Sequence, residues 1–293
     1  MSEIFDFLKK TEAKQANEPR DSFKEPASEL PQPLTDLNPA VTFSKEQSPA
    51  NVEICSDIKF DLTTASVQLK NVLDPLTLVG EQFRLLRSKL GLMQKQRGIK
   101  TILVTSSVPD EGKTFTASGL AGVFAQEPGK RVVLIDADMR KPKSGWNFGL
   151  NGSTESRGLS EVLRGHQEFS GELFMGLSST FFFLPSGPIP SNPSELLSSP
   201  NLERTIKTAA ANFDWVIIDS PPVLALADTM LIAPLVDAVV LVIRANSTAS
   251  KLIQETVNHI GRERVCGVVL NRQKRIHSSR YYYQYYYRSS KPQ

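Results

Sequence analysis

A nine-residue segment, SSVPDEGKT at positions 106–114, constrains the fold of this chain more than any other feature. It follows an apolar run at 100–105, typical of a buried strand, and precedes a segment at 113–124 with the pattern of a helix. A tight loop that opens onto a helix N-terminus presents backbone N–H groups and a favourable dipole to phosphate. The segment is therefore predicted to be a phosphate-binding loop, although Ser107 stands where the usual pattern has its first glycine.

This loop supplies candidate ligands for a nucleotide and its metal ion. The Lys113 ammonium is expected to reach the β- and γ-phosphates of ATP, and the Thr114 hydroxyl is expected to bind Mg²⁺. The other candidate nucleotide-binding residues of the loop are Ser107, Pro109, Glu111 and Gly112.

Acidic residues follow two further apolar runs. The run at 131–135 is followed by Asp136 and Asp138, and the run at 215–218 is followed by Asp219. In an open α/β sheet, ligands bind at the carboxyl ends of the strands. Strands ending at Thr105, Ile135 and Ile218 would therefore bring one lysine and three carboxylates to a single crevice suited to Mg·ATP.

The rest of the pattern alternates short apolar runs with helical segments. Strands are predicted at 181–184, 238–243 and 265–270, and helices at 192–197, 202–212 and 250–260, with Asn192 as a helix cap. Apolar strands separated by helices indicate a parallel sheet covered on both faces. The predicted fold class is α/β, a P-loop NTPase-like three-layer sandwich with a mostly parallel central sheet.

Composition changes at both ends of this pattern. Residues 1–77 are rich in Pro, Glu, Ser and Asn and are expected to form a largely disordered leader. The domain is expected to span 78–271, with a flexible basic tail at 272–293. Two cysteines offer no disulfide framework or metal-ligand spacing, and no apolar run is long enough for a membrane span. A cytoplasmic protein is predicted.

Every tyrosine of the chain lies in the tail. The cluster could be a π-rich surface that stacks on bases or on a partner, or a phosphorylation substrate on a tether. A core would use tyrosine throughout the chain, which favours the second interpretation. The candidate phosphoacceptors are Tyr281, Tyr282, Tyr283, Tyr285, Tyr286 and Tyr287.

Together, the loop, the run IDADMRKP at 135–142, the run IDSPP at 218–222 and the run NPSELL at 192–197 resemble the bacterial tyrosine kinases of exopolysaccharide and capsule assembly. More narrowly, the chain resembles the soluble type encoded beside chain-length-determinant proteins. The resemblance implies an ATP- and Mg²⁺-dependent tyrosine autokinase that regulates polysaccharide polymerisation, export and chain length. It implies that Asp138 and Asp219 serve the metal and that Asp136 accepts the tyrosine proton, although Asp136 and Asp138 remain alternatives for the base.

The same resemblance implies partners and one further nucleotide contact. Glu81, Arg84 and Arg87, on a predicted helix at 78–96, match a subunit-contact motif and imply a head-to-tail homo-oligomeric ring. Asn271 matches a position that contacts adenine in related ATPases. A transmembrane chain-length-determinant activator would recruit the kinase to the inner face of the membrane, a cognate tyrosine phosphatase would oppose it, and no nucleic acid partner is expected.

One departure from the family pattern and two alternative interpretations stay open. Asp110 falls where many members of the family have glycine, and its charge predicts a slight loss of nucleotide affinity. One alternative is a ParA/MinD-like ATPase switch, but the position of the signature lysine of that class is occupied by Val108. The other alternative is a nucleotide-gated, non-catalytic regulator of a polysaccharide assembly complex, against which the complete set of acids argues.

Overall fold

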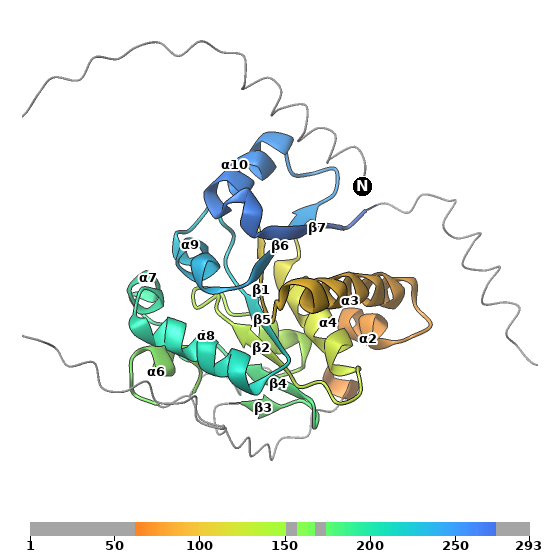
Figure 1. Ribbon diagram of the computed structural model, residues 1–293, viewed down its shortest axis with the longest axis horizontal. Coiled ribbons are helices and arrows are strands. Elements are labelled where there is room, and N and C mark those ends of the chain that lie inside the picture. The colour runs from red at the N-terminus through yellow and green to blue at the C-terminus, as the bar shows by residue number, and fades with distance from the viewer. Residues whose placement is uncertain (1–61, 151–156, 168–173, 274–293) are drawn as a thin grey trace, which may run out of the picture. The chain divides into compact units, whose positions relative to one another are not determined.

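A computed structural model of the protein describes residues 62–150, 157–167 and 174–273 (Figure 1). All of them belong to one compact unit, Gln47–Gln293. Residues 1–61 of the leader expected at 1–77, and the tyrosine cluster at 281–287, lie outside the described residues.

A seven-stranded sheet forms the centre of this unit, in the order β3-β4-β2-β5-β1-β6-β7. Every neighbouring pair is parallel except β3–β4, which is antiparallel. The predicted α/β fold with a mostly parallel sheet is confirmed. The strands are β1 (Thr101–Ser106), β2 (Val132–Asp136), β3 (Met175–Gly176), β4 (Phe181–Leu184), β5 (Trp215–Asp219), β6 (Ala238–Arg244) and β7 (Val265–Asn271).

Helices cover both faces of the sheet, as Figure 1 shows. Successive residues of β1 point to opposite faces, so Ile102 and Val104 join one core cluster while Leu103 joins the other. The first cluster is closed by α2 (Val67–Leu73), α3 (Leu78–Arg97) and α4 (Lys113–Ala125). The second is closed by α6 (Leu159–Leu163), α8 (Pro200–Asn212), α9 (Asp228–Ile232) and the end of α10 (Ser250–Ile260).

Short elements complete the description. They are the four-residue α5 (Ser144–Asn147), α7 (Pro193–Leu197) and the 3₁₀ turns η1 (Leu62–Thr64), η3 (Ala233–Leu235) and η4 (Arg262–Arg264). Asn192 precedes α7 as predicted, but its side chain does not cap the helix; its amide nitrogen donates to Glu195 instead. Among the described helices, none combines the length and apolar character needed to span a membrane.

The ordered structure begins before Leu78, which corrects the predicted domain boundary. Helix α2 lies inside the expected leader, and the Ser66 hydroxyl caps it by accepting from the Leu69 amide. Leu69 and Val72 are fully buried against α4. Only these two side chains of a seven-residue helix are buried, so the apolar period was too short to be recognised beside the prolines of the leader.

Candidate active site

The predicted phosphate-binding loop connects β1 to α4, and Lys113 is the first residue of that helix. Gly112 precedes it with φ 97°, a left-handed conformation that favours glycine. A Cβ at this position would also collide with the side-chain amide of Asn271, so the loop requires glycine for two reasons. Asp110 has φ 62°, one of three left-handed non-glycine residues among those described.

The other loop residues differ in what their side chains can offer a nucleotide. Ser107 is fully buried, and its hydroxyl has no hydrogen-bond partner among the described residues. Pro109 is exposed. Glu111 is buried, and its carboxylate accepts from the backbone amides of Val108 at 3.0 Å and Arg244 at 3.1 Å, and from the Thr248 hydroxyl. Its side chain therefore anchors the loop to the end of β6 and leaves phosphate binding to the backbone.

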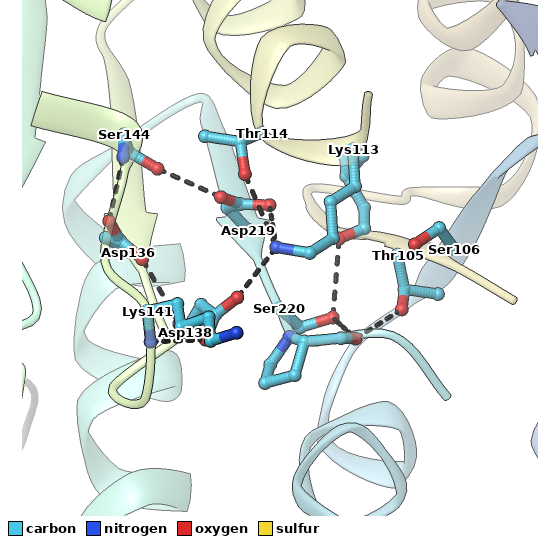
Figure 2. Close-up of polar contacts among 12 residues, drawn as sticks. Thr105, Ser106, Lys113, Thr114, Asp136, Asp138, Lys141, Ser144, Asp219 and Ser220 are labelled. Carbon is cyan, nitrogen blue, oxygen red and sulfur yellow. Dashed lines mark hydrogen bonds and ion pairs between the residues drawn. The ribbon is translucent and has the colours of Figure 1, made fainter. Parts of the chain in front are cut away.

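The lysine and the strand-end acids meet at the carboxyl ends of β1, β2 and β5. Figure 2 shows the Lys113 ammonium between two carboxylates, 2.8 Å from Asp138 Oδ2 and 3.7 Å from Asp219 Oδ1. The Thr114 hydroxyl lies 3.3 Å from the same nitrogen. The spatial convergence expected from three separate sequence motifs is present in the fold.

Asp136 lies beside this pair and is held by backbone amides. Its carboxylate accepts from the amides of Asp138 at 3.1 Å and Ser144 at 3.0 Å. The Ser144 hydroxyl in turn donates to Asp219 at 3.0 Å. Ser144 thus links two of the acids, a role that sequence analysis missed because no motif marks a serine eight residues after its partner.

Burial and mutual repulsion set the protonation of the cluster. Burial, assisted by the charge of Asp219, raises the pKa of Asp136 to about 7. Burial also raises the pKa of Asp219, although the Lys113 ammonium opposes the shift. For Lys113, burial would lower the pKa, but Asp219 and Asp138 together raise it. The lysine stays charged, and Asp136 can take up a proton near neutral pH.

Asn271 ends β7 next to the loop. Its amide nitrogen donates to the Glu111 carbonyl at 2.9 Å, and its amide oxygen accepts from the Arg272 backbone amide at 2.8 Å. The side chain therefore clamps the main chain of the phosphate-binding loop, and the predicted contact to adenine stays a prediction.

The predicted subunit-contact residues lie on α3, remote from the acids. Arg84 binds Glu81 at 2.8 Å and the Pro75 carbonyl at 2.7 Å. Arg87 donates to the Val123 carbonyl at 2.6 Å and pairs with Glu127 at 3.2 Å. Both arginines hold α3 within this subunit, and Glu81 is the most exposed of the three motif residues.

Comparison with known proteins identifies the family. An AAA domain matches residues 99–264. Tyrosine-protein kinase YwqD of Bacillus subtilis is 36% identical over 72% of this chain and 88% of its own length. Putative tyrosine-protein kinase CapB of Staphylococcus aureus is 30% identical over 72% of this chain and 92% of its own.

The chain belongs to the bacterial tyrosine kinases.

Solved structures agree with this bacterial tyrosine kinase assignment. The VpsO kinase domain has 30% identity and a TM-score of 0.59, over 71% of this chain and 96% of its own. The kinase domain of Escherichia coli tyrosine kinase ETK has 25% identity and a TM-score of 0.63, over 80% and 98%. The predictions of an ATP-using P-loop protein and of a tyrosine kinase are confirmed, and the ParA/MinD-like alternative is set aside.

The length of the match differs among relatives of this kinase. Tyrosine-protein kinase wzc of Salmonella typhimurium is 34% identical over 76% of this chain, but this match spans only 31% of wzc. The bacterial tyrosine kinase described here therefore corresponds to nearly the whole of YwqD and CapB, and to one part of wzc.

Proposed function

We propose that this protein is an autokinase, which uses Mg·ATP to phosphorylate the tyrosine cluster at 281–287 of its own sequence. We also propose that this modification regulates polysaccharide polymerisation, export and chain length. The observation that carries the proposal is the position of Lys113 between Asp138 and Asp219, with Asp136 alongside. Confinement of all six tyrosines to one basic segment supports the choice of acceptor.

The metal ion fits the donors that surround Lys113. Asp219 Oδ1 is buried and accepts no hydrogen bond within the described part of the chain, so an oxygen is available for a cation. No three His, Cys, Asp or Glu side chains of the described residues form a metal cage. The carboxylates at the site suit Mg²⁺, which prefers one or two carboxylates together with water and substrate phosphates. Thr114, Asp138 and Asp219 would hold it, and it would neutralise phosphate charge.

Phosphate binding and proton transfer are assigned to residues of the chain itself. Lys113 binds the β- and γ-phosphates, and the loop amides surround them. The phenolic oxygen of the acceptor bonds to the γ-phosphorus of ATP while the bond from that phosphorus to the β–γ bridging oxygen breaks, releasing ADP. Asp136 takes the phenolic proton, since Asp138 is already engaged with Lys113 at 2.8 Å.

We further propose that phosphorylation occurs between subunits of a head-to-tail ring. Residues 272–280 span at most about 30 Å at full extension. These residues follow strand β7. Strand β4, on the far side of the strand β2 that carries Asp136, is five strand positions from β7, or about 24 Å across the sheet. Distance alone therefore permits transfer within a subunit or between subunits. Leu85 and Leu92, exposed seven residues apart on α3, support a subunit contact there.

The cellular setting follows from the family resemblance. We propose a cytoplasmic kinase, recruited to the inner face of the membrane by a transmembrane chain-length-determinant activator and reversed by a cognate tyrosine phosphatase. Each phosphate adds about −1.5 to −2 charges, so several would reverse the charge of the basic tail and repel it from Asp136, Asp138 and Asp219.

Incubation of the purified full chain with radiolabelled ATP and Mg²⁺, followed by a phosphotyrosine blot, tests the chemistry. Lys113→Met should abolish labelling, EDTA should do the same, and Lys251→Met, an exposed lysine on α10, should label normally. Labelling of Lys113→Met at the wild-type rate would show that the site is misplaced.

A mixing experiment tests transfer between subunits. A Lys113→Met chain with its tail should become labelled by an active chain truncated after Arg280. Arg84 and Arg87 are poor probes of the ring because both bind within the subunit. Leu85→Glu with Leu92→Glu should instead reduce oligomer size on a sizing column and lower labelling in the mixture, with unchanged ATP affinity. A double variant that remains assembled and fully active contradicts the ring.

A further inference from the structure

A cleft of about 430 Å³ opens beside Asp136 at the carboxyl ends of β2 and β4. One wall comes from the segment after β2 and includes Trp146 on α5. The other comes from β4 and the segment that follows it, and includes Phe183, Pro188 and Ile189. In the sheet order β4-β2-β5-β1, Lys113 and Asp219 lie on the side of β2 that faces away from the cleft.

The wall after β4 is held in one conformation by backbone contacts. The amide of Leu159 donates to the Pro185 carbonyl at 2.9 Å, and the Ser160 hydroxyl donates to the Pro188 carbonyl at 2.9 Å. Gly187 has φ 77°, and a Cβ there would lie 2.8 Å from the Ser160 hydroxyl. The cleft is therefore a preformed feature, as ligand sites usually are.

Two large apolar side chains lie at the rim of this cleft and are exposed to solvent. Trp146 is 69% exposed and Ile189 is 65% exposed, although they come from segments more than forty residues apart. Single exposed apolar residues are ordinary on protein surfaces, but two that line one cleft with a buried carboxylate indicate a ligand with an apolar body. The backbone tie from Ser144 to Asp136 also fixes α5, and with it Trp146, relative to the acid.

We propose that this cleft binds the phenol ring of the acceptor tyrosine, one of those at 281–287 of a second copy of the chain, and that Trp146 and Ile189 select tyrosine over serine or threonine. The inference rests on the proposed function and adds the subsite of its acceptor. In-line displacement requires the acceptor and the leaving group on opposite sides of the phosphorus. With the nucleotide loop after β1, the acceptor enters from the β4 side, where the cleft lies.

Selection of tyrosine over serine and threonine follows from the cleft having an apolar end and an end that carries the Asp136 carboxylate. An aromatic ring buries apolar surface against Trp146, Phe183 and Ile189, while its hydroxyl reaches the Asp136 carboxylate. A serine or threonine hydroxyl oxygen is only two bonds from its Cα atom. It would have to draw the peptide main chain into the cleft to reach the same acid, at the cost of unsatisfied backbone groups.

The kinetic test uses a tail-bearing Lys113→Met chain as acceptor and an active chain truncated after Arg280 as enzyme. Trp146→Ala or Ile189→Ala in the enzyme should each raise the KM for the acceptor chain roughly tenfold, as expected for loss of about 1.4 kcal/mol of binding. The KM for ATP should not change. Trp146→Phe should restore most of the loss, and Val67→Ala, 66% exposed but on α2, should leave both values unchanged.

A binding measurement separates this inference from the proposed function. Trp215 is buried, so the response of tryptophan fluorescence to a surface ligand reports chiefly on Trp146. In a Lys113→Met chain truncated after Arg280, a peptide of residues 278–290 should change the emission, and the same peptide with serine for every tyrosine should not. If wild-type chain never labels but the tyrosine peptide alone gives this change, the cleft stands and the kinase proposal fails. Equal response to both peptides, or unchanged acceptor KM in Trp146→Ala, overturns the cleft.

Discussion

Arg140 and Asp228 form a two-point ion pair, with Nε 2.7 Å from Oδ2 and Nη2 3.1 Å from Oδ1. Asp228 is fully buried on α9, and it also accepts from the Ser194 hydroxyl on α7 at 2.6 Å. Burial would raise the pKa of Asp228, but the hydrogen bonds from Arg140 and Ser194 lower it. The pair ties the loop that carries Asp138, two residues before Arg140, to the helices on one face of the sheet.

Arg140→Lys should weaken this tie, because lysine cannot reproduce the two parallel hydrogen bonds of the guanidinium. We expect a loss of about 1–2 kcal/mol in the free energy of unfolding, measured in urea. We also expect kcat to fall roughly tenfold with little change in the KM for ATP, since a misplaced Asp138 affects the chemical step most. Arg164→Lys, which alters the partly exposed pair with Glu161, is the matched control and should change neither. Reduced stability with a normal kcat would leave the pair a purely structural role.

Asn271→Ala distinguishes a contact to adenine from a clamp on the phosphate-binding loop. Because its amide nitrogen holds the Glu111 carbonyl, we expect the Kd values of ATP and GTP to rise together, by roughly tenfold, as one partly buried hydrogen bond is lost. Calorimetric titration of both nucleotides checks this. A rise confined to ATP would assign Asn271 to recognition of the base instead.

Asp110→Gly tests the departure of the loop from its family pattern. Removing a negative charge beside bound phosphates should tighten ATP binding by roughly threefold, or about 0.7 kcal/mol, an effect that salt should diminish. Stability should change by less than about 1 kcal/mol, because relief of the left-handed conformation is opposed by the greater freedom of glycine in the unfolded chain. Asn246→Gly, also left-handed at φ 57°, changes no charge and should leave ATP affinity unaltered. Equal tightening in both variants would attribute the gain to the backbone.

Cys266 on β7 provides a test of burial through pH. Burial raises the pKa of this thiol to about 11, so little thiolate exists at pH 8. In a Cys55→Ser background, alkylation by iodoacetamide at pH 8 should be at least about tenfold slower in the folded protein than in urea. Since the folded pKa lies above the unfolded value of about 8.5, the thiol's contribution to stability is complete below pH 8.5 and is lost as pH rises toward 11. Equal alkylation rates in the two states would contradict this burial.

The parts of the fold predicted well are those with a local signal. Strands β1, β2 and β5 are continuous apolar runs bounded by polar residues, so their ends were placed within about one residue. Helix α2, strand β3 and helix α5 are too short to show a period, and their residues are ordered by contacts with distant segments. Leu69 of α2, for example, is buried in a core cluster that includes residues of α3, α4 and the sheet.

The sequence by itself determined which side chains converge at the candidate site. A lysine after a glycine at the start of a helix, and acids directly after buried strands, are consequences of local backbone geometry that any parallel sheet turns toward one edge. Only the tertiary structure decided how those side chains are used. It turns the Glu111 carboxylate toward the end of β6, engages Arg87 with the Val123 carbonyl of α4, and brings Trp146 and Ile189 to one cleft beside Asp136. These arrangements join residues tens to more than a hundred positions apart, and a contact at that separation depends on the packing of whole elements, which no local pattern encodes.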